Sequence, residues 1–181
     1  MPDLPTLPPV GVPVLWLCGP SGVGKSTVGW AIFDQLSRTG VRSAFLDLDQ
    51  VGLCYPAPAD DPDNHRIKMA NLGRVWPTYR SAGVRCLVLS GGVVTAGDAG
   101  AYTAAVPDAA LTICRLRAGA AELRARFFRR GWRHDLVDES VAEAEVLDRT
   151  GFADLCVDTD GLAVPEVARL VRERAGGWPQ R

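Results

Sequence analysis

Lysine is almost absent from this sequence of 181 residues, which uses 18 arginines and only two lysines, Lys25 and Lys68. The 20 basic side chains are balanced by 21 acidic ones, so the net charge is −1. This balance excludes a polybasic arm, and we do not expect nucleic acid as a partner. We ascribe the scarcity of lysine to the base composition of the genome, but it makes the position of each lysine informative.

Long apolar runs are also missing. No stretch approaches the ~18–20 uninterrupted apolar residues of a membrane span. The first residues, MPDLPTLPPVG, lack the basic and apolar regions of a signal peptide. Hydrophobic residues (47%) and charged residues (23%) occur at levels typical of a globular protein, which argues against disorder and collagen. We therefore expect a cytoplasmic protein with no membrane partner.

The cysteines form neither a C-x-x-C pair nor a cluster with metal-ligand spacing. There are five of them: Cys18, Cys54, Cys86, Cys114 and Cys156. Four lie in or beside short apolar runs, so we interpret these as reduced, buried, small hydrophobic residues. Cys54 falls in a predicted loop and is the one whose reactivity is worth testing.

The length favours one domain. Residues 1–10 are rich in proline and predict a flexible leader, residues 11–176 the domain, and residues 177–181 a tail in which Trp178 is frayed. Apolar runs alternate with helical patterns, which is typical of an α/β fold with a mostly parallel sheet. We expect strands over residues 12–18, 43–48, 85–89, 111–116 and 155–158. We expect helices over residues 25–38, 64–82, 98–105, 119–130, 138–149 and 165–174.

Three tryptophans and one proline carry expectations about packing. Pro77 predicts a kink or break near Trp76 in the second helix, because proline removes a hydrogen bond and its ring clashes with the preceding turn. Trp16 and Trp30 are expected in the core. Trp76 has the helical spacing of a core residue, with a binding role as the alternative.

One motif is complete. Residues 19–26, Gly-Pro-Ser-Gly-Val-Gly-Lys-Ser, match G-x-x-x-x-G-K-[ST], between an apolar predicted strand and an amphipathic predicted helix. The glycines let the backbone form a nest of N–H donors, and the helix N-terminus adds positive potential, so a triphosphate fits there. Lys25 is predicted to reach the β- and γ-phosphates as a catalytic group, and Ser26 to bind Mg²⁺. The predicted nucleotide-binding residues of this loop are Gly19, Ser21, Gly22, Val23, Gly24, Lys25, Ser26 and Thr27.

The rest of the chain separates the classes of protein that share this loop. No N-K-x-D follows the fourth predicted strand, where the sequence reads Arg115-Leu-Arg-Ala, so guanine recognition of the GTPase type is not expected. Ser90 and Thr95 occupy the region after the third strand where many ATPases carry an aspartate, which argues against an ATP-driven motor.

Two carboxylates end the second predicted strand, which reads Leu-Asp47-Leu-Asp49. Strand alternation places Asp47 and Asp49 on one face, at the sheet edge where ligands bind. One carboxylate would accept the proton of a substrate hydroxyl while the other orders Mg²⁺ or a substrate donor. We predict Asp49 as the base and Asp47 as the metal or substrate ligand. The alternative is that these aspartates only form a turn that caps the strand.

Four arginines have the spacing of one helical stripe at i, i+3, i+4 and i+7: Arg126, Arg129, Arg130 and Arg133. Like charges on one face are tolerated when an anion neutralises them, and phosphoryl transfer needs donors around the moving group. We expect two or three of the four to contact phosphate. Arg126 and Arg130 are assigned to the nucleotide, and Arg130 and Arg133 to catalysis. The alternative is a solvated face that pairs with Asp135, Asp138 and Glu139.

These motifs together resemble the P-loop kinases of small molecules, over about residues 12–175. Adenylylsulfate kinases carry L-D-G-D and E-N-I-R-R where this sequence has Leu46-Asp-Leu-Asp49 and Asp63-Asn-His-Arg-Ile67. Chloramphenicol phosphotransferase has a lid spaced R-x-x-x-R-G-x-R, matched from Arg126 to Arg133, and a last strand V-D-T, matched by residues 157–159. The resemblance also extends to the shikimate, gluconate and nucleoside-monophosphate kinases.

The resemblance implies a five-stranded parallel sheet of order 2-3-1-4-5 with helices on both faces and an arginine-rich lid over ATP. It implies ATP and Mg²⁺ as cofactors and a small-molecule substrate. It assigns Asn64, Arg66 and Arg80 to substrate binding, with Gly91 in the loop after the third strand. It places Thr159, in the loop after the last strand, near the adenine.

We therefore expect a kinase that transfers the γ-phosphoryl group of Mg·ATP to a hydroxyl of a metabolite or antibiotic. An adenylylsulfate kinase is one alternative. A nucleotide-binding regulator or a nucleic-acid end kinase is another. The sequence does not define the acceptor or the oligomeric state, and a homodimer stays open.

Overall fold

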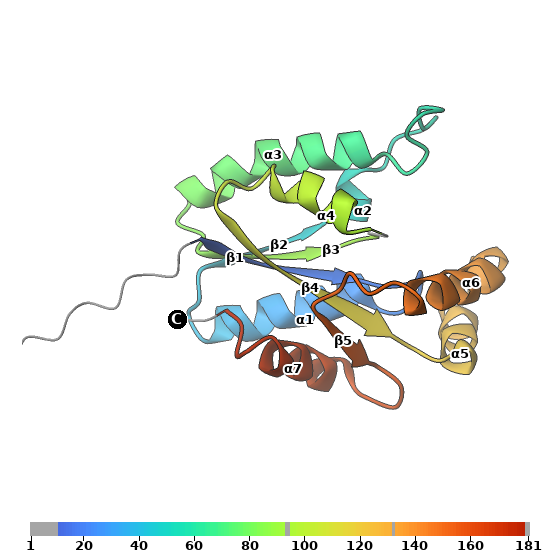
Figure 1. The fold of residues 1–181 in the computed structure, drawn as a ribbon. Helices are drawn as coiled ribbons and strands as arrows, with labels where there is room; N and C mark the ends of the chain where they lie inside the picture. Colours follow the sequence, from blue (N-terminus) through green and yellow to red (C-terminus); the bar gives the residue numbers. More distant parts are fainter. Residues whose placement is uncertain (1–10, 93–94, 132, 180–181) are drawn as a thin grey trace, which may run out of the picture.

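A parallel sheet with helices on both faces forms the body of the protein in the computed structural model, which describes residues 11–92, 95–131 and 133–179 (Figure 1). The expected leader lies outside these ranges. The strands are β1 (Val12–Cys18), β2 (Ser43–Asp47), β3 (Cys86–Ser90), β4 (Ala109–Arg117) and β5 (Leu155–Asp158). All pairings are parallel, and the order β2-β3-β1-β4-β5 is the expected one.

The helices agree with the sequence predictions to within two residues at each end. They are α1 (Lys25–Arg38), α3 (His65–Ser81), α4 (Ala96–Thr103), α5 (Ala120–Arg130), α6 (Val137–Asp148) and α7 (Val164–Arg174). Two short elements were not predicted: α2 (Leu48–Val51) and a 3₁₀ turn at His134–Leu136. Of the helices in the described ranges, none combines the length and the apolar character that crossing a membrane requires.

Figure 1 shows α3 and α4 on one face of the sheet, α1 and α7 on the other, and α5 and α6 beyond the carboxyl ends of the strands. Alternation along β1 divides the core accordingly. Leu15 and Leu17 pack with α1 and α7, whereas Val14 and Trp16 pack with α3 and α4. The sheet is thus buried on both faces, as its apolar strands require.

Two expectations about tryptophan are wrong. Trp178 is 3% exposed and packs in the core with α7, because the chain turns back after that helix and Trp178 N–H donates to Arg172 O. Trp30, expected in the core, is 60% exposed, because it lies on the outer side of α1 against Phe33 and Phe45. Trp16 is buried as expected.

Pro77 does not break α3, which runs without interruption from His65 to Ser81. Of the kink or break expected near Trp76, the break is therefore wrong. Leu72 and Trp76 are both buried against the sheet, so packing before the proline holds the helix despite the lost hydrogen bond. Trp76 accordingly belongs to the core and not to an acceptor pocket.

Candidate active site

The phosphate-binding loop joins β1 to α1 at the carboxyl edge of the sheet. Its three glycines all have positive φ angles, +135° at Gly19, +79° at Gly22 and +106° at Gly24. The Lys25 ammonium donates to the carbonyl oxygens of Gly19 at 2.8 Å and Pro20 at 3.1 Å. Ser26 and Thr27 lie exposed in the first turn of α1. The predicted loop residues are therefore brought together around one helix N-terminus.

Close packing adds a second requirement for glycine in this loop. A Cβ atom at Gly19 would lie 2.5 Å from the Leu116 carbonyl oxygen, and one at Gly22 would lie 2.6 Å from the Phe127 ring. Phe127 belongs to α5, so the helix of the predicted lid packs directly on the loop. No room is left for any side chain at these two positions.

An acidic side chain that the sequence analysis did not single out contacts the loop. Glu143 of α6 accepts a hydrogen bond from the Ser21 backbone N–H at 2.9 Å. One turn earlier in α6, the buried Ser140 hydroxyl donates to the Ser21 carbonyl oxygen. Ser21 is thus held by α6 through its backbone. Nothing in the local sequence around Glu143 signals this contact, because it joins residues 122 positions apart.

The two aspartates after β2 take different roles. The strand ends at Asp47, whose Oδ1 accepts from the backbone N–H groups of Asp49 (3.0 Å) and Gln50 (3.3 Å) and so caps α2. The expectation that both carboxylates share a strand face is wrong, because Asp49 already lies in the helical turn. The capping alternative holds for Asp47.

Asp49 forms an ion pair at the carboxyl edge of the sheet that the sequence analysis did not predict. Its Oδ1 lies 2.9 Å from Nζ of Lys68, whose side chain is 12% exposed. Gly91, which follows β3, lies beside this pair, since a Cβ atom there would be 3.6 Å from Asp49 Oδ1. Both lysines of the chain therefore lie at the candidate site. The rarity of lysine was the signal that could have pointed to Lys68.

The start of α3 faces the same edge. Asp61 is buried and accepts from the backbone N–H groups of His65 (2.8 Å) and Arg66 (3.0 Å). The Arg66 guanidinium donates twice to Asp60, at 2.7 and 2.8 Å, which lowers the pKa of that carboxyl. Asn64, at the N-cap, donates to Cys54 O at 3.2 Å. Asn64 and Arg66 thus lie near the acceptor side, but both are engaged with neighbouring loop residues.

A buried phenol supports this region. Tyr102 of α4 contacts His65 Nδ1 through its hydroxyl at 2.9 Å and packs edge-on against Trp16, with ring centroids 4.8 Å apart. Burial raises the pKa of Tyr102, and nearby carboxylates, Asp49 foremost, raise it further. The phenol is therefore neutral and keeps its proton.

Arg80 is not part of this site. It lies in the last turn of α3, fourteen residues after Arg66, which corresponds to about 21 Å along a helix. It lines a cavity at the opposite edge of the sheet instead. The expectation that Arg80 binds the substrate is wrong, because a helix of 17 residues carries its two ends to opposite sides of the domain.

The arginine stripe is shorter than its spacing predicted. Helix α5 ends at Arg130, because Gly131 adopts a left-handed conformation, φ +71°, and Arg133 also has a positive φ of +58°. Arg133 therefore leaves the helical face and lies 3.5 Å from Asp135 instead. Its expected place on one stripe with Arg126 is wrong. The predicted pairing with Asp135 holds for this one arginine.

Arg126 connects three parts of the site. It donates to Val23 O of the phosphate loop at 2.7 Å, to Thr159 O after β5 at 3.1 Å and to the Glu122 carboxylate at 2.8 Å. Arg129 also donates to Glu122 at 2.9 Å. The hydrogen bonds from Arg126 and then Arg129 lower the pKa of Glu122, which stays ionised.

Two cavities adjoin the phosphate loop. One of about 350 Å³ is lined by Gly24, Thr27, Arg126, Arg130 and Thr159, among others. The other, of about 260 Å³, lies between Pro20, the end of β4 and the loop after β5. Arg117 and Asp158 line the second one and are 3.4 Å apart. The buried Thr159 hydroxyl donates to Arg117 O at 2.9 Å, so its side chain supports the loop after β5.

The residues present fit a triphosphate with its metal. The three glycines with positive φ form the cradle, and a Cβ atom at Gly22 would break its packing against the Phe127 ring. The described residues contain no cluster of three or more His, Cys, Asp or Glu side chains that could hold a metal alone. This donor set suits Mg²⁺, which is typically bound by phosphate oxygens, waters and one or two protein oxygens. Ser26 and Asp47 are the protein groups at hand.

The class of the protein follows from these features. A strand, a glycine-rich G-x-x-x-x-G-K-S loop and a helix at the carboxyl edge of a 2-3-1-4-5 parallel sheet give this chain the P-loop fold of the small-molecule kinases. The expected resemblance is confirmed at this level.

Comparison with known proteins gives a more specific similarity for the first part of the chain, residues 11–72. The family model "Adenylylsulphate kinase" matches residues 11–72. The adenylyl-sulfate kinase of Enterobacter sp. (strain 638) is 38% identical over 73 residues, which cover 39% of this chain and 36% of that protein. The aligned part thus spans about a third of this curated relative.

Solved structures resemble nearly the whole chain at low identity. The tunicamycin resistance protein of Deinococcus radiodurans has a TM-score of 0.66 and 20% identity, over 91% of this chain and 96% of that one. The APS kinase of Mycobacterium tuberculosis, solved with AMPPNP and APS, has a TM-score of 0.65 and 19% identity, over 93% and 99%. At these identities the likeness defines the fold.

Proposed function

We propose that the protein is an ATP-dependent phosphotransferase that moves the γ-phosphoryl group of Mg·ATP to a hydroxyl of a small molecule. The observation that carries the proposal is that the phosphate loop and the Asp49–Lys68 pair lie close together at the same edge of the sheet. The phosphate loop with Lys25 follows β1, and the Asp49–Lys68 pair follows β2, with only β3 between these strands. A phosphate donor and a proton acceptor can therefore face one another across Gly91.

The phosphate loop would hold the nucleotide. Its N–H groups and the α1 N-terminus attract the β- and γ-phosphates, and Lys25 turns from the carbonyl oxygens of Gly19 and Pro20 to reach them. Ser26 would hold Mg²⁺ as a direct ligand and Asp47 as an outer one, and the ion would neutralise the charge of the phosphates. Arg126 fixes Val23 and Thr159 relative to α5. Arg130 lines the cavity of about 350 Å³ beside the loop, and we assign it to the moving phosphoryl group.

Asp49 is the proposed base. Its carboxylate would accept the proton of the acceptor hydroxyl, and Lys68 orients it through the 2.9 Å contact. Helices α5 and α6 contact the loop through Phe127 and Glu143, and their closure over bound nucleotide would exclude water, so that the phosphoryl group passes to the acceptor and not to solvent.

The proposed class of acceptor is wider than the substrate of any one similar protein. Adenylyl sulfate is one candidate, because the part of the chain that resembles adenylylsulfate kinases includes the phosphate loop, Asp49 and the start of α3. An antibiotic hydroxyl is another, since the fold also resembles a tunicamycin resistance protein. The engagement of Arg66 by Asp60 favours the broader reading, because an anionic acceptor would have to displace that carboxylate.

The test is ADP release from Mg·ATP by the purified protein against a panel of acceptors. The panel contains adenylyl sulfate, nucleosides and their monophosphates, gluconate, shikimate, chloramphenicol and tunicamycin. Lys25→Ala serves as the blank, since it keeps the fold but removes the phosphate-binding ammonium. Release above the blank with one acceptor supports a kinase and identifies the substrate. Equal release with and without every acceptor, in a protein that binds Mg·ATP, would favour a nucleotide-binding regulator instead.

A further inference from the structure

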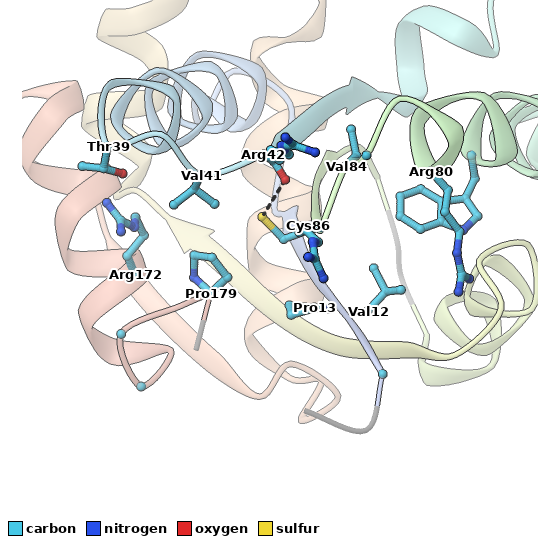
Figure 2. Close-up of a pocket in the computed structure, with 16 residues that line it drawn as sticks. Val12, Pro13, Thr39, Val41, Arg42, Arg80, Val84, Cys86, Arg172 and Pro179 are labelled. Carbon is cyan, nitrogen blue, oxygen red and sulfur yellow. Dashed lines mark hydrogen bonds between the residues drawn. The ribbon is translucent and has the colours of Figure 1, made fainter. Parts of the chain in front are cut away.

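A second large cavity lies at the edge of the sheet where the strands begin, opposite the phosphate loop. Its volume is about 1100 Å³. It is bounded by the first residues of β1, the turn after α1, the segment between α3 and β3, and the end of α7 with the chain that follows (Figure 2). None of the groups in the proposed reaction lines it.

The lining is strongly basic. Arg42, Arg80, Arg85 and Arg172 contribute, and no aspartate or glutamate is among the described residues that line the cavity. Arg172 donates to Trp178 O at 3.0 Å and to Gln35 at 3.4 Å, both uncharged partners. Elsewhere in the described chain arginines typically pair with carboxylates, as Arg66 does with Asp60 and Arg126 with Glu122. Positive charge is therefore concentrated here without a protein counter-ion among the described residues.

Helix dipoles do not account for this concentration. Arg80 and Arg172 lie in the last turns of α3 and α7, where a cation is favoured by the helix C-terminus. Arg42 and Arg85 lie outside the helices, just before β2 and β3, and are joined by a backbone hydrogen bond from Arg85 N to Arg42 O at 2.7 Å. Arg42 and Arg85 are exposed, and no helix terminus accounts for the position of their charges beside the cavity.

The cavity also has an apolar wall. Val12, Pro13, Val41 and Val84 line it together with the buried Cys86. Figure 2 shows Arg172 and Arg80 toward opposite sides of the cavity, with Arg42 and Cys86 between them. Apolar side chains therefore separate the guanidinium groups within the cavity. The arginines do not gather at one point, as they would around a single small anion.

We propose that this cavity binds a small organic molecule with two phosphate groups, such as a bisphosphorylated sugar or a similar metabolite. Two phosphates carry a charge of about −3 to −4 near neutral pH, which matches four guanidinium groups. Arginine suits phosphate because its planar fork donates two parallel hydrogen bonds. The apolar wall contacts the carbon skeleton that separates the two phosphates.

The experiment measures binding of fructose 1,6-bisphosphate as a probe, by calorimetry on the full chain without ATP. Fructose, inorganic phosphate and pyrophosphate are the comparison probes. The variants are Arg42→Gln/Arg85→Gln, which removes two cavity arginines, and Arg74→Gln/Arg149→Gln, which removes the same charge from exposed positions away from the cavity. Lys25→Ala reports binding at the phosphate loop, and circular dichroism checks that each variant is folded.

We expect the bisphosphate to bind the natural chain and Lys25→Ala equally, at least tenfold more tightly than inorganic phosphate. The cavity double variant should lose at least tenfold in affinity and the charge-matched control less than twofold. Loss of binding in Lys25→Ala would assign the probe to the phosphate loop and overturn the proposal. Equal loss in both double variants, or pyrophosphate binding as tight as the sugar bisphosphate, would also overturn it.

Discussion

The Glu143 carboxylate accepts a hydrogen bond from the Ser21 backbone N–H at 2.9 Å, so a negative charge lies against the loop that is built to hold phosphate. A nucleotide must either share this region with the carboxylate or displace it. Glu143 therefore opposes nucleotide binding by charge, while it holds α6 on the loop.

Replacement of Glu143 by glutamine keeps the size of the side chain and removes the charge. We expect Glu143→Gln to bind Mg·ATP about three- to tenfold more tightly, because a like-charge repulsion on the order of 1 kcal/mol is removed. Calorimetric titration measures the affinity. Glu139→Gln, one turn earlier on an exposed part of α6, is the control and should change it by less than about twofold. Weaker binding in Glu143→Gln would contradict the repulsion.

Asp49→Asn tests the base. We expect kcat to fall by about 10²-fold or more, because an amide does not accept the acceptor's proton. The dissociation constant for Mg·ATP should stay within about twofold, since Asp49 lies on the acceptor side with Lys68. Coupled ADP-release kinetics and calorimetry measure the two quantities. Asp63→Asn, an exposed carboxylate before α3, is the control, and full activity in Asp49→Asn would remove Asp49 from the mechanism.

Gly19→Ala tests the close packing of the phosphate loop. The new methyl group would lie 2.5 Å from Leu116 O, and φ is +135°. We expect a loss in the free energy of unfolding of about 2–4 kcal/mol, since strain and a backbone clash combine. Gly40→Ala is the control, because its φ of +75° is also left-handed but nothing lies within 4 Å. Urea denaturation should show a loss of about 1 kcal/mol there; equal losses in both variants would show that the clash relaxes.

The two tryptophans whose burial the sequence predicted wrongly form a matched pair. Trp178→Ala removes a side chain that is 3% exposed, so the expected cost in unfolding free energy is about 3–5 kcal/mol. Trp30→Ala removes one that is 60% exposed and should cost less than about 1 kcal/mol. Thermal unfolding of both variants checks the order, and a larger loss in Trp30→Ala would contradict it.

Thiol reactivity reports the burial of the cysteines. Burial raises the pKa of Cys18 to about 12 and that of Cys86 to about 11, so both stay protonated, and unreactive, at pH 8. Cys54 is exposed, and we expect one fast reaction with Ellman's reagent in the folded protein. Cys54→Ser should abolish the fast phase, and urea should make the remaining thiols react. A fast phase that survives in Cys54→Ser would show that another cysteine, first of all the partly exposed Cys156, reacts in the folded protein.

Local patterns in the sequence predicted the fold well. The run Val12–Cys18, the loop to Ser26 and the helix Lys25–Arg38 lie where they were expected, because apolar period, glycine spacing and a helix start all agree there. The period also predicted the remaining strands and all helices of eight or more residues in the described ranges to within two residues, but not the short α2 and 3₁₀ turn. The errors occur where a single residue ends an element. Gly131 stops α5 before Arg133, and Asp47 ends β2 by capping α2.

The candidate site was predicted less completely, because its contacts join distant parts of the chain. Arg80 shares a helix with Arg66, and only the length of that helix shows that they cannot share a site. Glu143 and Lys68 reach the site from α6 and α3, and no motif marks either of them. Trp178 is buried because the chain folds back after α7, a tertiary event that the composition of the tail does not encode locally.

The first strand–loop–helix unit touches both ends of the domain. Val12 and Pro13 line the cavity that contains the four arginines. Strand β1 then runs about 20 Å to the phosphate loop, and α1 returns the chain to Thr39 at the same cavity. Strand β1 is hydrogen-bonded on both sides along its length, to β3 and β4, so its two ends keep a constant separation. A ligand at either end would therefore contact one continuous segment of 31 residues, and hydrogen exchange along residues 12–42 would register the occupancy of both sites.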